Sequence, residues 1–321
     1  MEIDVKDKRI ITELSLNARA PVSAIARAVG LSKQVVKYRI ENLEKRGIIE
    51  GYYAILNITK MGFAYHRIFV TFMNVNKETE AEIVDFCIKH KKVGWIAQLD
   101  GDLDCGIIVF AKDVVEFSQV YDELLSKFGE HLDEKQLSVA TQIHHLKHKF
   151  LLQKIDTTDL VMGGSVTEPS IDDTDYKILG VLTKSARKSL LELGSSLRLN
   201  PKVVGYRIKR MAEEGIILGY NVKLNHLMLG YSHYKVNLHL NNMSKEDLMA
   251  IIQHILQMPE SIYITRAIGP YELEFELMVR NNEEFHTLIR ELRFRFARII
   301  KNYTTFIIHH EPYINYLPLM K

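Results

Sequence analysis

Apolar residues recur at helical spacing near the start of the chain and at strand spacing farther on. In about the first 45 residues they form three sets spaced three or four residues apart, which predicts three short helices with one buried face each. Gly30 is positioned to end the second helix and Ser32 to cap the third. The apolar sets are Ile10, Ile11 and Leu14; Ile25, Ala26 and Val29; and Val36, Ile40 and Leu43.

After Gly47 the pattern becomes that of strands. A connecting strand, "IIEGYYAIL", is followed by the order strand, helix, strand, strand, helix, strand, with helices expected at residues 77–90 and 113–128. This βαββαβ order is the ferredoxin-like arrangement, so the predicted fold class is α+β. Phe69 and Met73 add apolar side chains to the second face of the first strand, which predicts that another sheet covers this face.

The whole pattern occurs twice, as a tandem repeat. Adding 168 to a residue number carries Asp7 to Asp175 and Tyr38 to Tyr206, and the register needs no gap. Residues 154–174, "KIDTTDLVMGGSVTEPSIDDT", join the two copies. This segment is acidic, contains a Gly pair and a Pro, and shows no apolar period, which is typical of a linker.

The second and third predicted helices form a helix-turn-helix. Between Ser32 and Arg46 there are five basic residues against two acidic ones, and both acids lie toward the C-terminal half. An α-helix fits the major groove of DNA, and the first turns of such a helix reach the base edges. The segment therefore indicates DNA binding, with a merely solvated basic helix face as the alternative.

The stretch "NARAPVSAIARAVGLSKQVVKYRIENLEKRGIIEGYYAILN" strongly resembles the Lrp/AsnC, or feast/famine, family of transcriptional regulators. The resemblance extends over nearly the whole chain, twice. It implies sequence-specific binding of double-stranded DNA, dimerisation through sensing domains, and control by an amino acid or another small effector. The domains that it implies are a winged helix-turn-helix at 1–56, a ferredoxin-like sensing and dimerisation domain at 57–153, the linker at 154–174, a second winged helix-turn-helix at 175–224 and a second sensing domain at 225–321.

Two units in one chain are a departure from the family, whose members usually carry one unit and pair up. We therefore expect an intrachain pseudo-dimer, which can assemble further into a homo-oligomer. The copies differ mainly at positions that would face DNA. We therefore expect either an asymmetric DNA site, or one helix-turn-helix that contacts bases while the other contacts only phosphates. The changes are Lys33 to Pro201, Gln34 to Lys202 and Lys37 to Gly205.

Several polar residues of the helical modules are candidates for DNA contact. Arg39 and Arg207 occupy the family's recurrent arginine position, and each could meet a phosphate or pair with an acid of its own domain. Tyr52 and Tyr220 are expected to anchor the connecting strand by packing, and Asn200 can cap the helix of copy two. The candidate DNA-binding residues are Ser32, Lys33, Gln34, Lys37, Tyr38, Arg39, Asn200, Lys202, Tyr206 and Arg207.

The loop between the two central strands of each sensing domain lies near effector and oligomer interfaces in the family. It reads "GDLD" at 101–104 and "GPYE" at 269–272, where the family usually has Gly, any residue, Tyr, Asp. Asp104 and Glu272 could hold an α-ammonium group, and the alternative is that the glycines supply a turn and the acids stay in water. The candidate effector-binding residues are Gly101, Asp102, Asp104, Gly269, Tyr271 and Glu272.

Composition and histidine placement limit the other classes. The chain has 321 residues, 47% hydrophobic and 26% charged, with a net charge of +2, as in a globular protein of several domains. We expect a reduced, cytoplasmic protein without a signal peptide, membrane span or cofactor. Strand alternation separates His144 and His148 from His145, and the pair at 309–310 is out of register with them, so no metal is expected.

Two other functional classes compete with a regulator. Siroheme decarboxylases use the same two-module architecture and need basic and His side chains at a tetrapyrrole cleft. This chain instead keeps a basic, capped helix in copy one, and "PYELEFELMV" after Gly269 is acidic where an anion site would need positive charge. We therefore predict a DNA-binding regulator and not an enzyme, with an architectural protein of low sequence preference as a third alternative.

Overall fold

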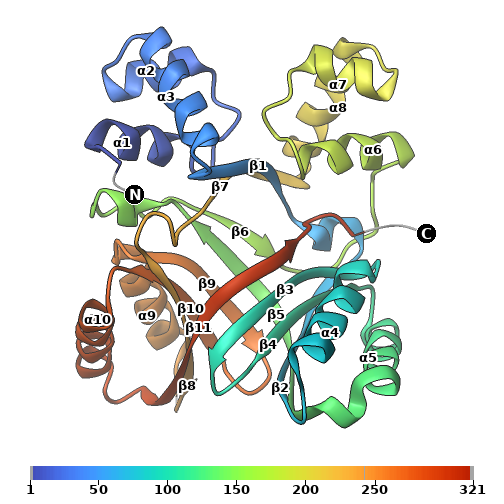
Figure 1. The fold of residues 1–321 in the computed structure, drawn as a ribbon, viewed down its shortest axis with the longest axis vertical. Coiled ribbons are helices and arrows are strands. Elements are labelled where there is room, and N and C mark those ends of the chain that lie inside the picture. The colour runs from blue at the N-terminus through green and yellow to red at the C-terminus, as the bar shows by residue number, and fades with distance from the viewer. Residues whose placement is uncertain (1–2, 242, 319–321) are drawn as a thin grey trace.

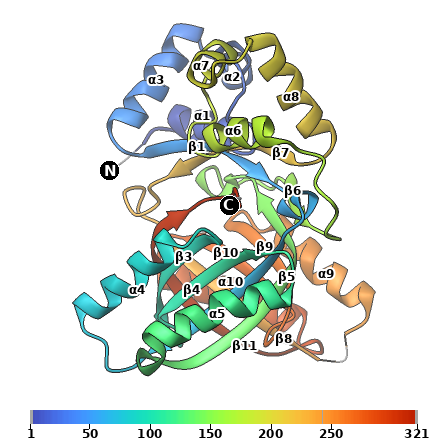
Figure 2. The same cartoon turned by 90° about the vertical axis from the view of Figure 1, so that its right-hand side faces the viewer.

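The computed structural model describes residues 3–241 and 243–318. Two helical heads lie at one end of the molecule and a larger body of sheet and helices at the other (Figure 1). The view turned by 90° keeps both heads above the same body (Figure 2). The predicted α+β architecture of two repeats is confirmed.

Head one and head two each contain the three predicted helices. In head one, Gly30 has a left-handed backbone (φ 68°) at the end of the second helix, and the Ser32 hydroxyl accepts a hydrogen bond from the Val35 amide. In head two, Arg198 takes the left-handed conformation (φ 56°), which a side chain disfavours. The helices are α1 (Val5–Leu14), α2 (Val22–Val29) and α3 (Lys33–Lys45), then α6 (Asp173–Leu182), α7 (Leu190–Leu197) and α8 (Pro201–Glu213).

The connecting strands of the two copies pair with each other. Strand β1 (Ile49–Leu56) runs antiparallel to β7 (Ile217–Leu224) and forms a two-stranded ribbon beneath the heads (Figure 1). Each head is followed directly by one strand of this ribbon. A displacement of the ribbon would therefore move both heads.

The body is a closed antiparallel sheet to which both copies contribute four strands. Within each copy the strand order is ferredoxin-like, and β3–β11 and β5–β9 pairing joins the copies. Because β2 also pairs with β5, the eight strands close into a barrel. The strands are β2 (Ala64–Phe72), β3 (Val93–Gly101), β4 (Cys105–Ala111) and β5 (Leu132–Leu146), then β8 (Ser232–Leu240), β9 (Ser261–Ile268), β10 (Leu273–Val279) and β11 (Ile300–Ile314).

Two helices of each copy cover the outside of the barrel on opposite flanks (Figure 1). They bury the outward apolar face of their own sheet, as the core clusters of each copy show. Inside the barrel, Phe69 is buried and its ring lies 6.2 Å from that of Phe306, which confirms a second covering sheet there. Met73 is exposed because β2 ends before it, so the expectation for Met73 was wrong. The helices are α4 (Lys77–Lys89) and α5 (Val114–Phe128), then α9 (Lys245–Gln257) and α10 (Asn282–Arg295).

The segment that joins the copies contains regular structure, contrary to the expectation of a plain linker. Strand β6 (Asp159–Gly163) pairs with β5 at the edge of the body. Met162 is buried in the core, and the Asn57 side chain bonds both the amide and the carbonyl of Gly163. Strand β6 has five residues, DLVMG, and its apolar run is too short to predict a strand from the sequence.

Gly101 and Gly269 are equivalent positions at the two junctions between copies. A Cβ at Gly101 would lie 3.1 Å from the Phe306 Cβ, and a Cβ at Gly269 only 2.5 Å from the Ser138 Cβ. Gly101 has φ 141° and Gly269 has φ 155°, which side chains rarely adopt. Glycine therefore lets the strands of the two copies approach closely.

Gly269→Ala should destabilise the protein by about 1–3 kcal/mol, since it adds backbone strain and forces β9 away from β5. The urea midpoint is the measurement. Gly51→Ala is the matched control, because nothing lies within 4 Å of a Cβ there and its φ is ordinary. A Gly269→Ala midpoint equal to that of Gly51→Ala would contradict the tight junction.

No helix in the described residues is long and apolar enough to cross a membrane. Cys87 and Cys105 are both buried and unbridged. Burial raises the pKa of the Cys87 thiol to about 12, so this thiol stays protonated at neutral pH.

Candidate DNA-binding interface and the cavity between the copies

Helix α3 is the last helix of head one and leads toward β1 (Figure 1), and one of its faces is polar and exposed. Val36, Ile40 and Leu43 are buried against the rest of the head. The opposite face exposes the candidate side chains, with Tyr38 69% exposed. They are Lys33, Gln34, Lys37 and Tyr38. Such a face can enter a DNA groove without unfolding the head.

Helix α8 of head two has the same backbone arrangement but fewer polar side chains at the equivalent positions, where Pro201 and Gly205 replace Lys33 and Lys37. The Asn200 side chain accepts a hydrogen bond from the Lys202 amide, as expected of a cap. Tyr206 is 68% exposed. A Cβ at Gly205 would lie 3.1 Å from Leu190, so the glycine lets α7 pack closely against α8.

Arg39 and Arg207 each lie within an ion-pair network of their own head. The Arg39 Nη1 lies 2.9 Å from Asp4 and 2.7 Å from Asp7, and Arg207 makes the equivalent pairs with Asp172 and Asp175. The hydrogen bond from Arg207 is the main cause that lowers the pKa of Asp172 to about 2. These arginines therefore hold α3 to α1 in head one and α8 to α6 in head two.

Arg19 and Arg187 connect the two heads reciprocally, a role that the sequence did not reveal. The Arg19 guanidinium lies over the Tyr220 ring of copy two (5.4 Å) and donates to the Lys188 carbonyl (2.9 Å). Arg187 lies over the Tyr52 ring of copy one (5.3 Å) and donates to the carbonyl of Ala18. The repeat showed two equivalent arginines, but only the fold shows that each reaches into the other copy.

The two hairpin loops engage their acids with backbone amides. Asp104 Oδ2 accepts a hydrogen bond from the Phe72 amide (2.6 Å), and Glu272 Oε2 accepts one from the Leu240 amide (3.1 Å). Gly101 and Gly269 lie at the junctions described above, Asp102 is exposed, and the Tyr271 ring lies 4.6 Å from the His239 ring. Each acid thus fixes the end of the neighbouring strand of its own copy.

His144 and His145, near the end of β5, and His148, which follows the strand, have different surroundings. His144 Nδ1 lies 2.6 Å from Asp159 Oδ2. His145 is 1% exposed, and its ring packs edge-on against Tyr263 at 4.6 Å. Burial lowers the pKa of His145 to about 3 and that of His148 to about 4, so both rings are neutral at pH 7.

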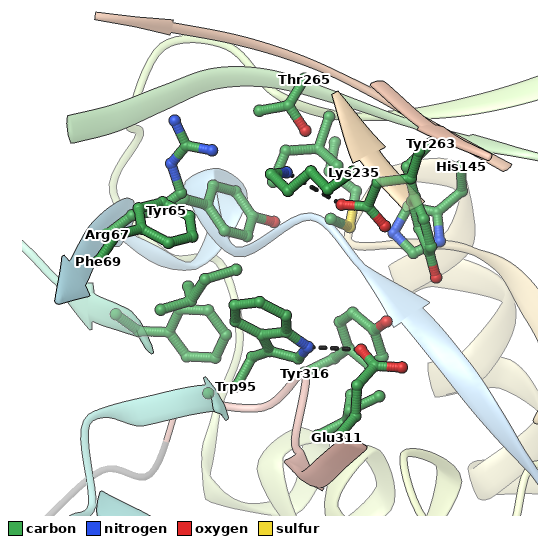
Figure 3. A pocket seen from close by; sticks show the side chains of 17 residues that line it. Tyr65, Arg67, Phe69, Trp95, His145, Lys235, Tyr263, Thr265, Glu311 and Tyr316 are labelled. Carbon is green, nitrogen blue, oxygen red and sulfur yellow. Dashed lines mark hydrogen bonds and ion pairs between the residues drawn. The ribbon is translucent and has the colours of Figure 1, made fainter. Parts of the chain in front are cut away.

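A cavity of about 80 Å³ lies inside the barrel between the copies (Figure 3). Arg67 donates two hydrogen bonds of 2.6 Å to Glu274, and Lys235 lies 2.8 Å from Glu274 and 3.0 Å from Glu276. Burial alone would raise the pKa of Glu274, but the charges of Arg67 and Lys235 lower it to about 2. The acidic side chains of β10 thus neutralise two buried cations, Arg67 and Lys235. Arg67 and Glu274 are 207 positions apart in the sequence.

Both heads match a family model described as winged helix-turn-helix DNA-binding, over residues 3–50 and 171–217. The chain is 33% identical over 125 residues to the proline dehydrogenase transcriptional activator of Rhodobacter capsulatus, covering 39% of this chain and 81% of the relative. It is 30% identical over 128 residues to the HTH-type transcriptional regulator LrpA of Pyrococcus abyssi, covering 39% of this chain and 87% of the relative. The matched part of the chain is thus much shorter than the chain itself.

Among solved structures, the siroheme decarboxylase NirDL is similar over 98% of this chain and 94% of its own, with a TM-score of 0.65 and 12% identity. At this identity the likeness shows a shared fold alone.

The capped helices on two helix-turn-helix heads define a winged helix-turn-helix DNA-binding protein. Together with the relatives of 33% and 30% identity that are covered over 81% and 87% of their own length, this shows that the chain belongs to the Lrp/AsnC family of transcriptional regulators.

Proposed function

We propose that this protein is a sequence-specific regulator that binds double-stranded DNA as an intrachain pseudo-dimer with two unlike readers. The observation that carries the proposal is the difference between α3 and α8 on otherwise equivalent heads. Helix α3 begins with Lys33 and Gln34, whereas α8 begins with Pro201 and Lys202. The DNA site of such a protein is asymmetric.

The connections between the heads support action as one unit. The ribbon of β1 and β7 and the reciprocal contacts of Arg19 and Arg187 join the heads directly. A fixed spacing between two recognition helices selects DNA half-sites at a fixed separation. The two heads therefore bind one duplex together rather than two duplexes independently.

The decarboxylase alternative has less support. The cavity between the copies, at about 80 Å³, is well below the roughly 300–1,000 Å³ of ordinary ligand pockets. Arg67 and Lys235 also line it, but both are already paired with Glu274 and Glu276, so neither is left to bind the carboxylate side chains of a tetrapyrrole. Absorbance titration with a tetrapyrrole tests this alternative, and a saturable spectral shift would favour the enzyme.

The experiment for the proposal is a binding titration of the full chain on genomic DNA fragments at two salt concentrations. A regulator should bind one or a few fragments at least about 1,000-fold more tightly than the rest. An architectural protein would bind all fragments alike with a steep salt dependence. Uniform binding, or none, would contradict the proposal.

Control by an amino acid at the hairpin loops is the other part of the expectation from the sequence. Asp104 and Glu272 would have to exchange the Phe72 and Leu240 amides for an α-ammonium group. Calorimetry with the twenty amino acids tests this directly. Heat that disappears in Asp104→Asn would support an effector site at the loop, and heat of dilution alone would count against it.

A further inference from the structure

The cavity inside the barrel lies at the pseudo-twofold axis of the repeat. Residues that are 168 positions apart both line it, which places equivalent points of the two copies around one space. Arg67 and Lys235 are such a pair, and so are Trp95 and Tyr263. Between the copies of a symmetric dimer the two halves of this cavity would be identical.

Here the two halves differ in charge. Glu276 and Glu311 of copy two line the cavity, and their equivalents in copy one are the lining residues Ile108 and Ile143. Glu274, directly behind Arg67, corresponds to Gly106. Every carboxylate at this cavity therefore comes from copy two.

The charged side chains at and next to the cavity, Arg67 and Lys235 with Glu274, Glu276 and Glu311, carry one more negative than positive charge. Arg67 and Lys235 are engaged by Glu274 and Glu276, and His233 lies 2.9 Å from Glu276. Glu311 accepts a hydrogen bond of 2.6 Å from the Trp95 indole, and within residues 3–241 and 243–318 no Lys or Arg nitrogen lies within 4.0 Å of it. A carboxylate beside an aromatic wall favours a cation.

A neutral histidine also lines the cavity, next to Tyr316. His145 is 1% exposed, and its Nδ1 has no hydrogen-bond partner in the described part of the chain. Because burial keeps the pKa of His145 at about 3, this ring supplies no positive charge at neutral pH. Figure 3 shows Glu311 beside the Trp95 indole and His145 beside Tyr263, and the Tyr316 ring lies 5.8 Å from the His145 ring.

We propose that this cavity is a binding site for a small organic ammonium ion without a carboxylate, with Glu311 as its counter-ion and Trp95 and Tyr316 as aromatic walls. A cavity of about 150 Å³ holds benzene, so one of about 80 Å³ holds an ammonium group with its first carbons, and because the cavity is partly open the end of a short alkyl chain can extend out of it. An amino acid is excluded because its carboxylate would face Glu276 and Glu311.

The site has a physical connection to the heads. The Tyr316 ring stacks on Tyr53 of β1 (5.0 Å, 10°), and the Asn221 amide of β7 donates to the Tyr53 hydroxyl (3.4 Å). Asn221 Oδ1 in turn accepts a hydrogen bond from the Leu16 amide of head one (3.2 Å). A ligand against Tyr316 thus bears on the ribbon that joins the heads, a consequence that rests on the proposed DNA-binding function.

Fluorescence of Trp95 reports on the cavity directly, because the chain has one tryptophan. We would titrate the full chain without DNA with n-butylammonium chloride, and with butyrate, 1-butanol and glycine at matched ionic strength. The expected result is a saturable spectral change with butylammonium alone. No saturable change, or an equal one with butyrate or glycine, would overturn the proposal whether or not the chain binds DNA.

Glu311→Gln keeps an oxygen that can accept the Trp95 N–H and removes the charge. It should weaken butylammonium binding at least tenfold, whereas Glu82→Gln, at an exposed acid of α4, should leave it unchanged. Equal affinity in all three proteins would overturn the role of Glu311, with circular dichroism as the check on folding. If Glu311→Gln does not fold, the comparison of butylammonium with butyrate on the natural chain decides the proposal.

Coupling to the heads has its own readout. At saturating butylammonium the affinity for a bound genomic fragment should change at least threefold in the natural chain and not in Glu311→Gln. An unchanged affinity with a filled cavity would overturn the coupling while leaving the binding site in place.

Discussion

Replacing both Lys33 and Gln34 by Ala should weaken binding to the preferred DNA fragment by about 10- to 100-fold, the loss of one or two good contacts to bases. Both side chains are exposed in the first turn of α3, the part of a recognition helix that reaches base edges. Affinity for unrelated DNA should fall much less, since it depends on phosphates. Fluorescence anisotropy with the two DNAs measures both losses.

Lys202→Ala is the matched variant in head two. Lys202 is the residue equivalent to Gln34, and it lies exposed in the first turn of α8. Its loss should cost less than about threefold in specific binding, as for a single phosphate contact. Equal losses in the two heads would show that the ranking of the readers is wrong.

The largest effect on stability is expected at the buried ion pair between the copies. Arg67 and Glu274 are each about 3% exposed, so removing either one leaves a charge without its main partner. Arg67→Met and Glu274→Leu should each destabilise the protein by about 3–5 kcal/mol. Urea or thermal unfolding, followed by circular dichroism, measures the change.

The double variant Arg67→Met/Glu274→Leu is the control for this prediction. It removes both charges and leaves Lys235 paired with Glu276, so it should be more stable than either single variant. Losses that simply add would contradict a coupled buried pair.

The same ion pairs predict a dependence of stability on pH. Burial would raise the pKa values of Glu274 and Glu276. The charges of Arg67 and Lys235 instead lower the pKa of Glu274 from 4.5 to about 2, and the charge of Lys235 lowers the pKa of Glu276 from 4.5 to about 2. A depressed carboxyl pKa stabilises the fold above the unfolded value and loses this contribution as the pH falls toward the folded value. The contribution should therefore be complete above about pH 5 and decline between pH 4.5 and 2.

The local elements could be predicted from the sequence because their signals are local. Apolar spacing predicted the helices of the heads, Gly30 predicted the end of α2, and Ser32 predicted the start of α3. The repeat then gave the second copy without further evidence. Each of these inferences uses residues only a few positions apart, or one fixed offset.

The contacts between copies could not be predicted, because they join distant residues whose local patterns are ordinary. Arg19 looks like any exposed arginine until the fold places it over Tyr220. Glu274 reads as part of an acidic strand until the barrel places Arg67 beside it. The cavity also forms only when the barrel closes. Strand β6 could not be predicted because its own sequence shows no strand pattern, and its pairing with β5 is what makes it a strand.

The most direct test of the central claim is a hydroxyl-radical footprint of the full chain on its preferred fragment, combined with base substitutions in each half of the protected site. We expect two unlike half-sites on one face of the duplex, with substitutions in one half costing at least tenfold more affinity than those in the other. We also expect that replacing Lys33 and Gln34 by Ala removes this difference. A palindromic site whose halves are equally sensitive to substitution would contradict the claim that the two heads read DNA differently.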